Sequence, residues 1–383
     1  MWYKIKTELS LYLHFPFCKR KCFYCDFNSY SGIEPLMPEY IECLLLEIKK
    51  ILPQHRLIRS VYFGGGTPSY FPVQSLVSVL QYLKENFLIN RATEITIEAN
   101  PGTVTAQDLI LLYEAGFNRL SLGVQAAQDE LLVRIGRIHT WPDFLAVFQQ
   151  AREVGFSNIG IDLICGLPGQ SIEAWRDSLY KVVFLEPEHI SAYALQLESN
   201  TPLAKMVDDG TLTLPAEEDV VSMLQMSMDY LRKSGYEHYE ISNYAKPGFH
   251  SVHNTGYWSG RDYLGFGAGA TSTFHENRWN NVSSPQEYIR RLKNGQTVAV
   301  ESEIIDSSTA ITEAVMLGLR MRSGIDLPLF KEQFQFDLAI GVAGQIAMLE
   351  KGGLLTCRNA HLALTDRGVM VSNYVISSIL AGL

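Results

Sequence analysis

The sequence has few of the features that mark secreted, membrane-spanning or nucleic-acid-binding proteins. Its six cysteines form no even, regular framework, which argues for a reducing compartment. No apolar run approaches the roughly 18 residues of a membrane span, and the first residues lack the pattern of a signal peptide. Acidic residues outnumber basic ones by 41 to 32, without a basic block. We therefore expect a cytoplasmic protein with no transmembrane segment and no nucleic acid partner.

What the sequence does have is a regular alternation of strand-like and helix-like patterns. With 383 residues, 47% of them hydrophobic, the chain is long enough for one large domain and a smaller one. Six strands alternate with helical runs, and such βα units form a parallel sheet that closes or nearly closes into a barrel. The predicted strands lie at residues 9–13, 61–63, 94–98, 120–124, 159–163 and 189–194.

The pattern changes after about residue 200. A long helix is predicted at residues 215–234, and loop-rich segments follow at 250–258 and 263–270. Beyond residue 285 the chain becomes mainly helical, and a hairpin is predicted at 354–364. We expect one domain at residues 1–285 and a second, winged-helix-like domain at 286–383. Because the chain is acidic, a lid or docking role for the second domain is favoured over DNA binding.

Three cysteines, Cys18, Cys22 and Cys25, follow the first strand with the spacing CxxxCxxC. Soft thiolates suit zinc, copper(I) or iron–sulfur clusters. A structural zinc site takes four protein ligands, and the remaining cysteines show no paired spacing. Three thiolates on a four-iron cluster would leave one iron open to a cofactor. On spacing alone, a zinc site and three unrelated buried thiols remain alternatives.

Polar side chains stand at several predicted strand ends, where the chemistry of a parallel barrel gathers. By strand alternation, Tyr12, Glu98, Gln125 and Asp162 face away from the apolar side of their strands. Their shared position indicates a common site. The other interpretation of each residue is a helix cap or a hydrogen-bonded polar group at the start of a loop.

A glycine run, Gly64-Gly-Gly-Thr-Pro68, stands where the second strand turns into a helix. Glycines here let the backbone approach a ligand closely and present its amides or carbonyls. Any tight turn between a strand and a helix also favours glycine, so the run alone is a weak signal.

The CxxxCxxC spacing, with the aromatic Tyr24 before the third cysteine, resembles the radical-SAM superfamily. The resemblance implies a partial (βα)6 barrel and a 4Fe-4S cluster on the three cysteines. The fourth iron would be chelated by the amino and carboxylate groups of S-adenosylmethionine. It also implies that Arg137, otherwise expected as a surface helix residue, pairs with the methionine carboxylate. Implied cofactor-contacting residues are Tyr12, Tyr24, Gly65, Gly66, Thr67, Glu98, Gln125, Arg137, Asp162 and, more loosely, Ala194.

Four motifs narrow the resemblance to one branch of the superfamily: CKRKCFYCDFN, EANPG, SLGVQ and GLPGQ. This branch contains oxygen-independent coproporphyrinogen III oxidase and the HemW family of haem chaperones. The oxidase has a further cysteine two residues after the third, where this chain has Asp26-Phe27. His253-Asn-Thr-Gly-Tyr-Trp258 resembles the HNxxYW motif of HemW. One departure is Thr271, where HemW proteins often have histidine.

The resemblance implies a haem chaperone that binds haem, the cluster and S-adenosylmethionine, with no net turnover. It would transfer haem to acceptor haem proteins such as respiratory enzymes, through peripheral contact where these are membrane-bound. His253 and His250 are candidate haem ligands. His253 is equally a loop residue bonded to its own backbone, or part of a seal over the cofactor cavity. The alternative functions are radical-SAM decarboxylation of coproporphyrinogen III and, more distantly, an iron–sulfur transcriptional regulator.

Overall fold

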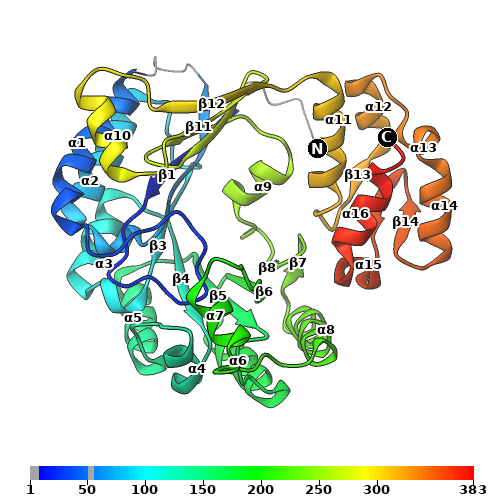
Figure 1. Cartoon of the computed structure of the whole chain (residues 1–383), viewed down its shortest axis with the longest axis horizontal. Coiled ribbons are helices and arrows are strands. Elements are labelled where there is room, and N and C mark those ends of the chain that lie inside the picture. The colour runs from blue at the N-terminus through cyan, green and yellow to red at the C-terminus, as the bar shows by residue number, and fades with distance from the viewer. Residues whose placement is uncertain (1–7, 51–55) are drawn as a thin grey trace.

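The computed structural model describes residues 8–50 and 56–383, and Figure 1 shows a curved sheet with helices on its outer face. At the centre of the sheet, six strands pair in parallel with their neighbours in chain order. Strands are thus present at each of the six predicted positions. They are β1 (Glu8–Phe15), β2 (Leu57–Gly65), β3 (Glu94–Ala99), β4 (Arg119–Gln125), β5 (Ile159–Cys165) and β6 (His189–Ala194).

Helices in the connections between these strands cover the outer face of the sheet (Figure 1). Their ends follow from local sequence, as α5 shows. Thr140 and Asp143 form a reciprocal capping box at its start, and Gly155 ends it in the left-handed conformation. The apolar periodicity of the sequence predicts that the first helix continues to Leu52, and this extension lies outside the described residues. The helices are α1 (Met37–Lys50), α2 (Val73–Asn86), α3 (Ala106–Ala115), α4 (Asp129–Arg134), α5 (Trp141–Val154) and α6 (Ile172–Phe184).

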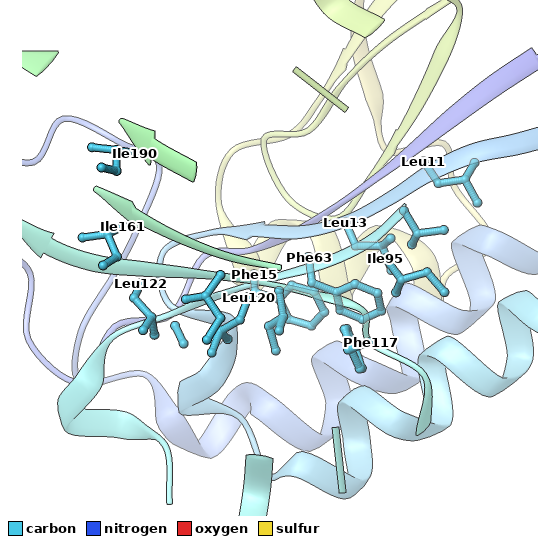
Figure 2. Packing of buried hydrophobic residues seen from close by; sticks show 14 of the residues in the cluster. Leu11, Leu13, Phe15, Phe63, Ile95, Phe117, Leu120, Leu122, Ile161 and Ile190 are labelled. Carbon is cyan, nitrogen blue, oxygen red and sulfur yellow. The ribbon is translucent and has the colours of Figure 1, made fainter. Parts of the chain in front are cut away.

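The main core lies between this outer face and the helices (Figure 2). Leu11, Leu13 and Phe15, at alternate positions of β1, are fully buried there. Phe15 stacks on Phe63 at 5.5 Å between ring centroids, and Phe63 meets Phe117 edge-on at 4.9 Å. Because one face of each strand is used in this way, the other face turns its polar residues toward the interior of the curved sheet.

Further strands extend both sides of the parallel core into a 12-stranded sheet. On one side, β9 (Tyr263–Phe266) pairs in parallel with β1 and is followed by antiparallel strands. On the other side, β8 (Asn243–Ala245) pairs antiparallel with β6, and β7 (Glu237–His238) with β8. The antiparallel strands beyond β9 are β10 (Thr271–Phe274), β11 (Asn277–Asn281) and β12 (Ala299–Ile304).

The segments at 250–258 and 263–270, predicted to be rich in loops, contain helix α9 (Val252–Trp258) and strand β9. Ser251 caps α9 by accepting a hydrogen bond from the Asn254 amide. The buried Glu94 carboxylate of β3 accepts the Val252 and His253 amides, both at 2.9 Å. A carboxylate at a helix N-terminus is stabilising, and this one comes from a distant strand. Other helices in this part are α7 (Pro202–Asp208), α8 (Glu217–Lys233) and α10 (Pro285–Lys293).

The C-terminal part is mainly helical and contains a small three-stranded sheet. The predicted hairpin is present as β14 (Leu355–Arg358) and β15 (His361–Leu364), joined by β13 (Ile325–Asp326). In the part of the chain that the structure describes, no helix is both long and apolar enough to cross a bilayer. The helices are α11 (Ser307–Gly318), α12 (Leu327–Phe334), α13 (Leu338–Gly341), α14 (Ala343–Lys351), α15 (Asp366–Met370) and α16 (Ser372–Leu380).

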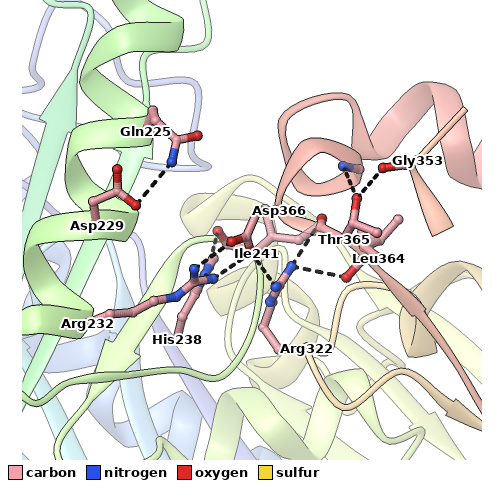
Figure 3. A network of polar contacts seen from close by, with 11 residues as sticks. Gln225, Asp229, Arg232, His238, Ile241, Arg322, Gly353, Leu364, Thr365 and Asp366 are labelled. Atoms are coloured by element: carbon pink, nitrogen blue, oxygen red, sulfur yellow. Dashed lines mark hydrogen bonds and ion pairs between the residues drawn. The ribbon is translucent and has the colours of Figure 1, made fainter. Parts of the chain in front are cut away.

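A charged network ties this C-terminal part to helix α8 (Figure 3). Arg232 donates two hydrogen bonds of 2.7 Å to the Asp366 carboxylate, and Arg322 donates a third of 2.6 Å. The hydrogen bonds from Arg232 lower the pKa of Asp366 to about 2. His238 lies 3.2 Å from the Arg232 guanidinium. The network therefore fixes α15 against the large sheet.

Candidate functional site

A cavity of about 840 Å³ opens inside the curved sheet, within the range of about 300–1,000 Å³ typical of small-molecule sites. Its wall comes from the interior faces of the strands, the cysteine-bearing loop, α8 and the C-terminal part. Twelve of the fifteen predicted site residues line it, and Tyr12, His250 and His253 do not. The twelve are Cys18, Cys22, Tyr24, Cys25, Gly65, Gly66, Thr67, Glu98, Gln125, Arg137, Asp162 and Ala194.

The cysteine loop is fixed at both ends by strand β1 and its neighbours. The Cys18 amide donates to the Tyr30 carbonyl at 2.8 Å. The His14 Nε2 lies 2.9 Å from the Asn28 carbonyl, and the Asn28 side chain donates to the Ala268 carbonyl at 3.0 Å. Because both ends are held, the three cysteines between them face the cavity from a defined position.

Each sulfur has a polar neighbour. Thr67 donates to the Cys18 sulfur at 3.5 Å, Arg137 donates to the Cys22 sulfur at 3.5 Å, and the Ser29 hydroxyl lies 4.0 Å from the Cys25 sulfur. Burial raises the pKa of the Cys18 and Cys25 thiols. The thiolate forms therefore need a cation beside them, which a metal centre supplies.

The three sulfurs do not define a site for a single metal ion. Within the described ranges, no three His, Cys, Asp or Glu side chains converge on one position that such an ion could occupy. A cubane cluster takes one thiolate per iron, so its ligands surround a larger object. The three cysteines are also one ligand fewer than a structural zinc site takes.

The glycine run brings strand β2 against the chain that leads into the cysteine loop. The Gly66 and Thr67 amides donate to the Phe15 and Phe17 carbonyls at 2.9 Å. A Cβ on Gly66 would lie 2.8 Å from the Phe17 carbonyl oxygen, closer than real contacts allow. Gly65 has a φ of 114°, which favours glycine. The glycine run was predicted to let the backbone approach a ligand. In the structure, Gly66 approaches the backbone of Phe15 and Phe17.

Glu98, at the end of β3, is held in place from two sides. The Tyr62 hydroxyl donates to one carboxylate oxygen at 2.7 Å, and the Gly65 amide donates to the other at 3.1 Å. Burial raises the pKa of Glu98 to about 7. The pKa of this carboxyl group therefore lies near neutral pH.

A bulge in β4 places Gln125 and Arg137 beside the cysteines. The strand register shifts between Gly123 and Gln125, and Gln125 has a φ of 74°, unusual for a residue other than glycine. Arg137 donates to the Gly123 carbonyl and to the Cys22 sulfur. Its buried Nε has no hydrogen-bond partner. The Arg137 guanidinium thus keeps one N–H group that can donate a hydrogen bond to a ligand.

Asp162 and Ala194 belong to β5 and β6. The Ser121 hydroxyl donates to the Asp162 carboxylate at 3.4 Å, and burial raises the pKa of this group. Ala194, the last residue of β6, pairs with Cys165. Tyr24 packs against a small apolar cluster formed around α4, and burial raises the pKa of its hydroxyl.

Tyr12 and His253 do not line the main cavity. The Tyr12 hydroxyl lies 2.9 Å from the His14 Nδ1, and Tyr12 lines an adjacent cavity of about 340 Å³ together with Thr271. The His253 ring is 1% exposed. Its Nδ1 lies 2.9 Å from the Ser60 hydroxyl, and its Nε2 lies 3.0 Å from the Tyr257 hydroxyl. Burial lowers the pKa of His253 to about 3. Both ring nitrogens are therefore already hydrogen-bonded.

Among the other residues that line the cavity, Tyr62, Arg119 and His189 were not predicted from the sequence. Each lies on the interior face of its strand. The position of Arg119 could have been predicted from the sequence. It is two residues before Ser121 in an otherwise apolar strand, so both side chains lie on the same face.

Comparison with known proteins identifies the class of protein to which this fold belongs. Residues 12–180 match the model of the radical SAM superfamily, and residues 305–371 match that of the HemN C-terminal domain. In the solved structure of coproporphyrinogen III oxidase (HemN) from Escherichia coli, 91% of that chain aligns with 98% of this one. The TM-score is 0.87 and the sequence identity 25%. The protein therefore has the α/β radical-SAM fold of HemN with a mainly helical C-terminal domain.

Curated relatives define the family within this class. The heme chaperone HemW of Lactococcus lactis is 34% identical over 371 residues, which are 97% of each chain. HemW of Bacillus subtilis is also 34% identical, over 98% of this chain and all of its own. A zebrafish relative, radical S-adenosyl methionine domain-containing protein 1, is 31% identical over 98% of this chain and 88% of its own. The chain belongs to the family of the heme chaperone HemW.

Proposed function

We propose that this protein is a haem chaperone that holds haem, a 4Fe-4S cluster and S-adenosylmethionine and delivers haem to acceptor haem proteins. The observation that carries the proposal is one cavity lined by all three cysteines and by most of the predicted cofactor residues. Similarity to HemW chaperones over nearly the whole chain supports it.

The residues of the cavity fit a cluster and its cofactor. Cys18, Cys22 and Cys25 offer soft thiolate ligands at one wall, and the buried Arg137 Nε is a donor without a partner beside them. Burial disfavours free thiolates here, and iron would compensate for that cost.

Within this fit, each side chain has a role in binding. The three cysteines hold three irons, and Arg137 pairs with the methionine carboxylate. The backbone at Gly65, Gly66 and Thr67 faces the methionine amino group. The carboxylates and amide nearby hold the ammonium and ribose hydroxyls. When bound, cluster and S-adenosylmethionine supply redox chemistry, which the chaperone uses for regulation without net turnover. The residues that hold the ammonium and ribose hydroxyls are Glu98, Gln125 and Asp162. Tyr24 and Ala194 complete the wall of the main cavity, and Tyr12 lines the adjacent one.

For His253 the contacts favour a positioning role over haem ligation. Its ring stacks on Tyr62 at 4.8 Å, and Tyr62 in turn donates to Glu98. We propose that the HNxxYW helix supports the cofactor wall through this stack. Haem ligation by His253 stays a prediction, and it would require either the hydrogen bond to Ser60 or the one to Tyr257 to break.

We also propose a cytoplasmic location and respiratory haem proteins as acceptors, reached by peripheral contact where these are membrane-bound. The six parallel strands are best described as a partial (βα)6 barrel, and the C-terminal helices with the β14–β15 hairpin as a winged-helix-like docking domain. The division between residues 285 and 286 stays a prediction. Because β12 still pairs with the large sheet, a boundary after Ile304 is a second possibility.

The test is a pair of anaerobic assays on the purified, cluster-reconstituted protein. Titration with haemin should produce a Soret band that saturates at a fixed stoichiometry. Incubation with coproporphyrinogen III, S-adenosylmethionine and a reductant should yield no protoporphyrinogen at turnover rates. Failure to bind haemin with or without the cluster would refute the chaperone function, and turnover of coproporphyrinogen III would indicate the oxidase instead.

A further inference from the structure

A second charged position lies inside the barrel, away from the cysteines. Arg119, the first residue of β4, is 2% exposed and lines the main cavity. Its Nε has no hydrogen-bond partner. The charge of Glu94 acts on it, but the Glu94 carboxylate is already hydrogen-bonded to two backbone amides of α9. Burial opposes the charged form, but Glu94 and, more weakly, Asp162 raise the pKa of Arg119. What the guanidinium lacks is therefore a hydrogen-bond acceptor at Nε, and a buried donor without an acceptor is costly.

Polar atoms of His189 and Ser121 lie close to the Arg119 guanidinium, beside Gly160 of β5. A Cβ built on Gly160 would lie 3.2 Å from an Arg119 Nη, 3.4 Å from the His189 Nδ1 and 3.6 Å from the Ser121 hydroxyl. Glycine leaves this point free, although its backbone conformation does not require glycine. The absence of a side chain at Gly160 therefore leaves room for a ligand atom that contacts the Gly160 backbone and lies beside these three polar groups.

His189 completes the set as a donor. It is 1% exposed, and its Nε2 lies 2.8 Å from the Tyr239 hydroxyl. Its Nδ1 has no partner within the described residues. When the Tyr239 hydroxyl donates to Nε2, the neutral imidazole carries its proton on Nδ1 and donates toward the free point. The Ser121 hydroxyl donates there after a rotation away from Asp162.

Three donors, one of them a guanidinium, match a carboxylate. We propose that Arg119, Ser121 and His189 bind a carboxylate of the porphyrin, that is, a haem propionate; this rests on the proposed haem chaperone function. Asp162 and Glu98 also face the cavity, and burial raises the pKa of both.

The methionine carboxylate of S-adenosylmethionine is a second source of the same chemistry, and the geometry disfavours it. Arg137, beside the Cys22 sulfur, contacts Gly123. Arg119 is four residues before Gly123 on the same strand, about 13 Å away at roughly 3.3 Å per residue. A carboxylate chelated to the cluster lies at the cysteine end. A porphyrin, whose propionates extend from one edge of the ring, reaches deeper.

The experiment compares haemin with haemin dimethyl ester, which lacks both carboxylates, on the full-length cluster-loaded protein. Wild type should bind haemin about tenfold more tightly than the ester, the expected value for a hydrogen-bonded charge. Arg119→Gln should bind both equally, and Gly160→Ala, which fills the free point, should do the same. The matched control is Arg152→Gln, a partly buried arginine of α5 that pairs with Glu188 and does not line the cavity, which should keep the preference.

A parallel titration with S-adenosylmethionine distinguishes the haem propionate from the methionine carboxylate. Arg119→Gln should leave the affinity for S-adenosylmethionine unchanged. Loss of S-adenosylmethionine binding with an intact haemin preference would overturn the inference. So would a wild type that binds haemin and its ester equally well, although the chaperone function would then stand. If wild type binds no haemin at all, both proposals fail. Should Arg119→Gln not fold, wild type and Gly160→Ala still decide the question.

Discussion

Several residues of the cavity wall have a structural partner as well as a predicted ligand. Glu98 is hydrogen-bonded by Tyr62 and Gly65, and Arg137 joins the Cys22 sulfur to the Gly123 carbonyl. These contacts orient the side chains before a ligand arrives, so less conformational freedom is lost on binding. The wall is thus preorganised residue by residue.

The ligand assignment predicts which cysteines hold iron. Cys22→Ser should abolish the broad brown absorbance that appears after anaerobic reconstitution, because the cluster loses a thiolate. Cys43→Ser is the matched control and should leave the absorbance unchanged. Cys43 is also buried, but it lies on α1, where its sulfur contacts the Ile289 carbonyl at 3.8 Å. Equal loss in the two variants would contradict the assignment.

At the scale of single elements, the helices on the outside of the sheet depend on their caps. Replacing Thr140 with alanine removes the hydroxyl of the α5 capping box. This change should lower the free energy of unfolding by about 1 kcal/mol. Ser222→Ala, within α8, removes a hydroxyl bonded only to the Glu218 carbonyl and should be nearly neutral. Chemical denaturation of both variants measures the difference, and an equal effect would argue against the cap.

Elements with a local signal could be predicted from the sequence. Alternation of Leu9, Leu11 and Leu13 marks β1, and the cysteine spacing marks the loop that follows it. Helix α9 was missed, because the Glu94 carboxylate that caps it comes from β3, more than 150 residues away in sequence. The free point above Gly160 was missed for the same reason, since residues of three strands meet there.

The candidate site shows the same limit. The residues that a motif contains, such as Cys18 and Gly66, line the cavity as predicted. The orientation of His253 was not predictable, because its hydrogen bonds to Ser60 and Tyr257 depend on how α9 packs against β2. A motif thus indicates which residues gather, while the packing of distant elements decides which of their atoms remain free.

At the scale of the whole molecule, the Asp366 network joins the C-terminal part to the large sheet (Figure 3). Asp366→Asn should lower the free energy of unfolding at pH 7 by about 1–2 kcal/mol, a modest value because the carboxylate is 43% exposed. Asp229→Asn, on the exposed side of α8, is the control and should have little effect.

The effect of Asp366 should also depend on pH. Its folded pKa, about 2, lies below the unfolded value of about 3.9. The contribution to stability is therefore complete above the unfolded pKa and is lost as the pH falls toward 2. Urea denaturation of wild type and Asp366→Asn at pH 7 and at pH 3 should show a difference that shrinks with acid. A constant difference would mean that the carboxylate charge is not what stabilises the joint.

The central claim is that three thiolates hold a cluster with one iron left for S-adenosylmethionine. The most direct measurement is electron paramagnetic resonance of the reduced, reconstituted protein before and after S-adenosylmethionine is added. We expect the signal of a 4Fe-4S cluster whose g-values change when the cofactor binds, because a ligand joins one iron. A signal that the cofactor leaves unchanged, or a protein that takes up zinc in place of iron, would contradict the account.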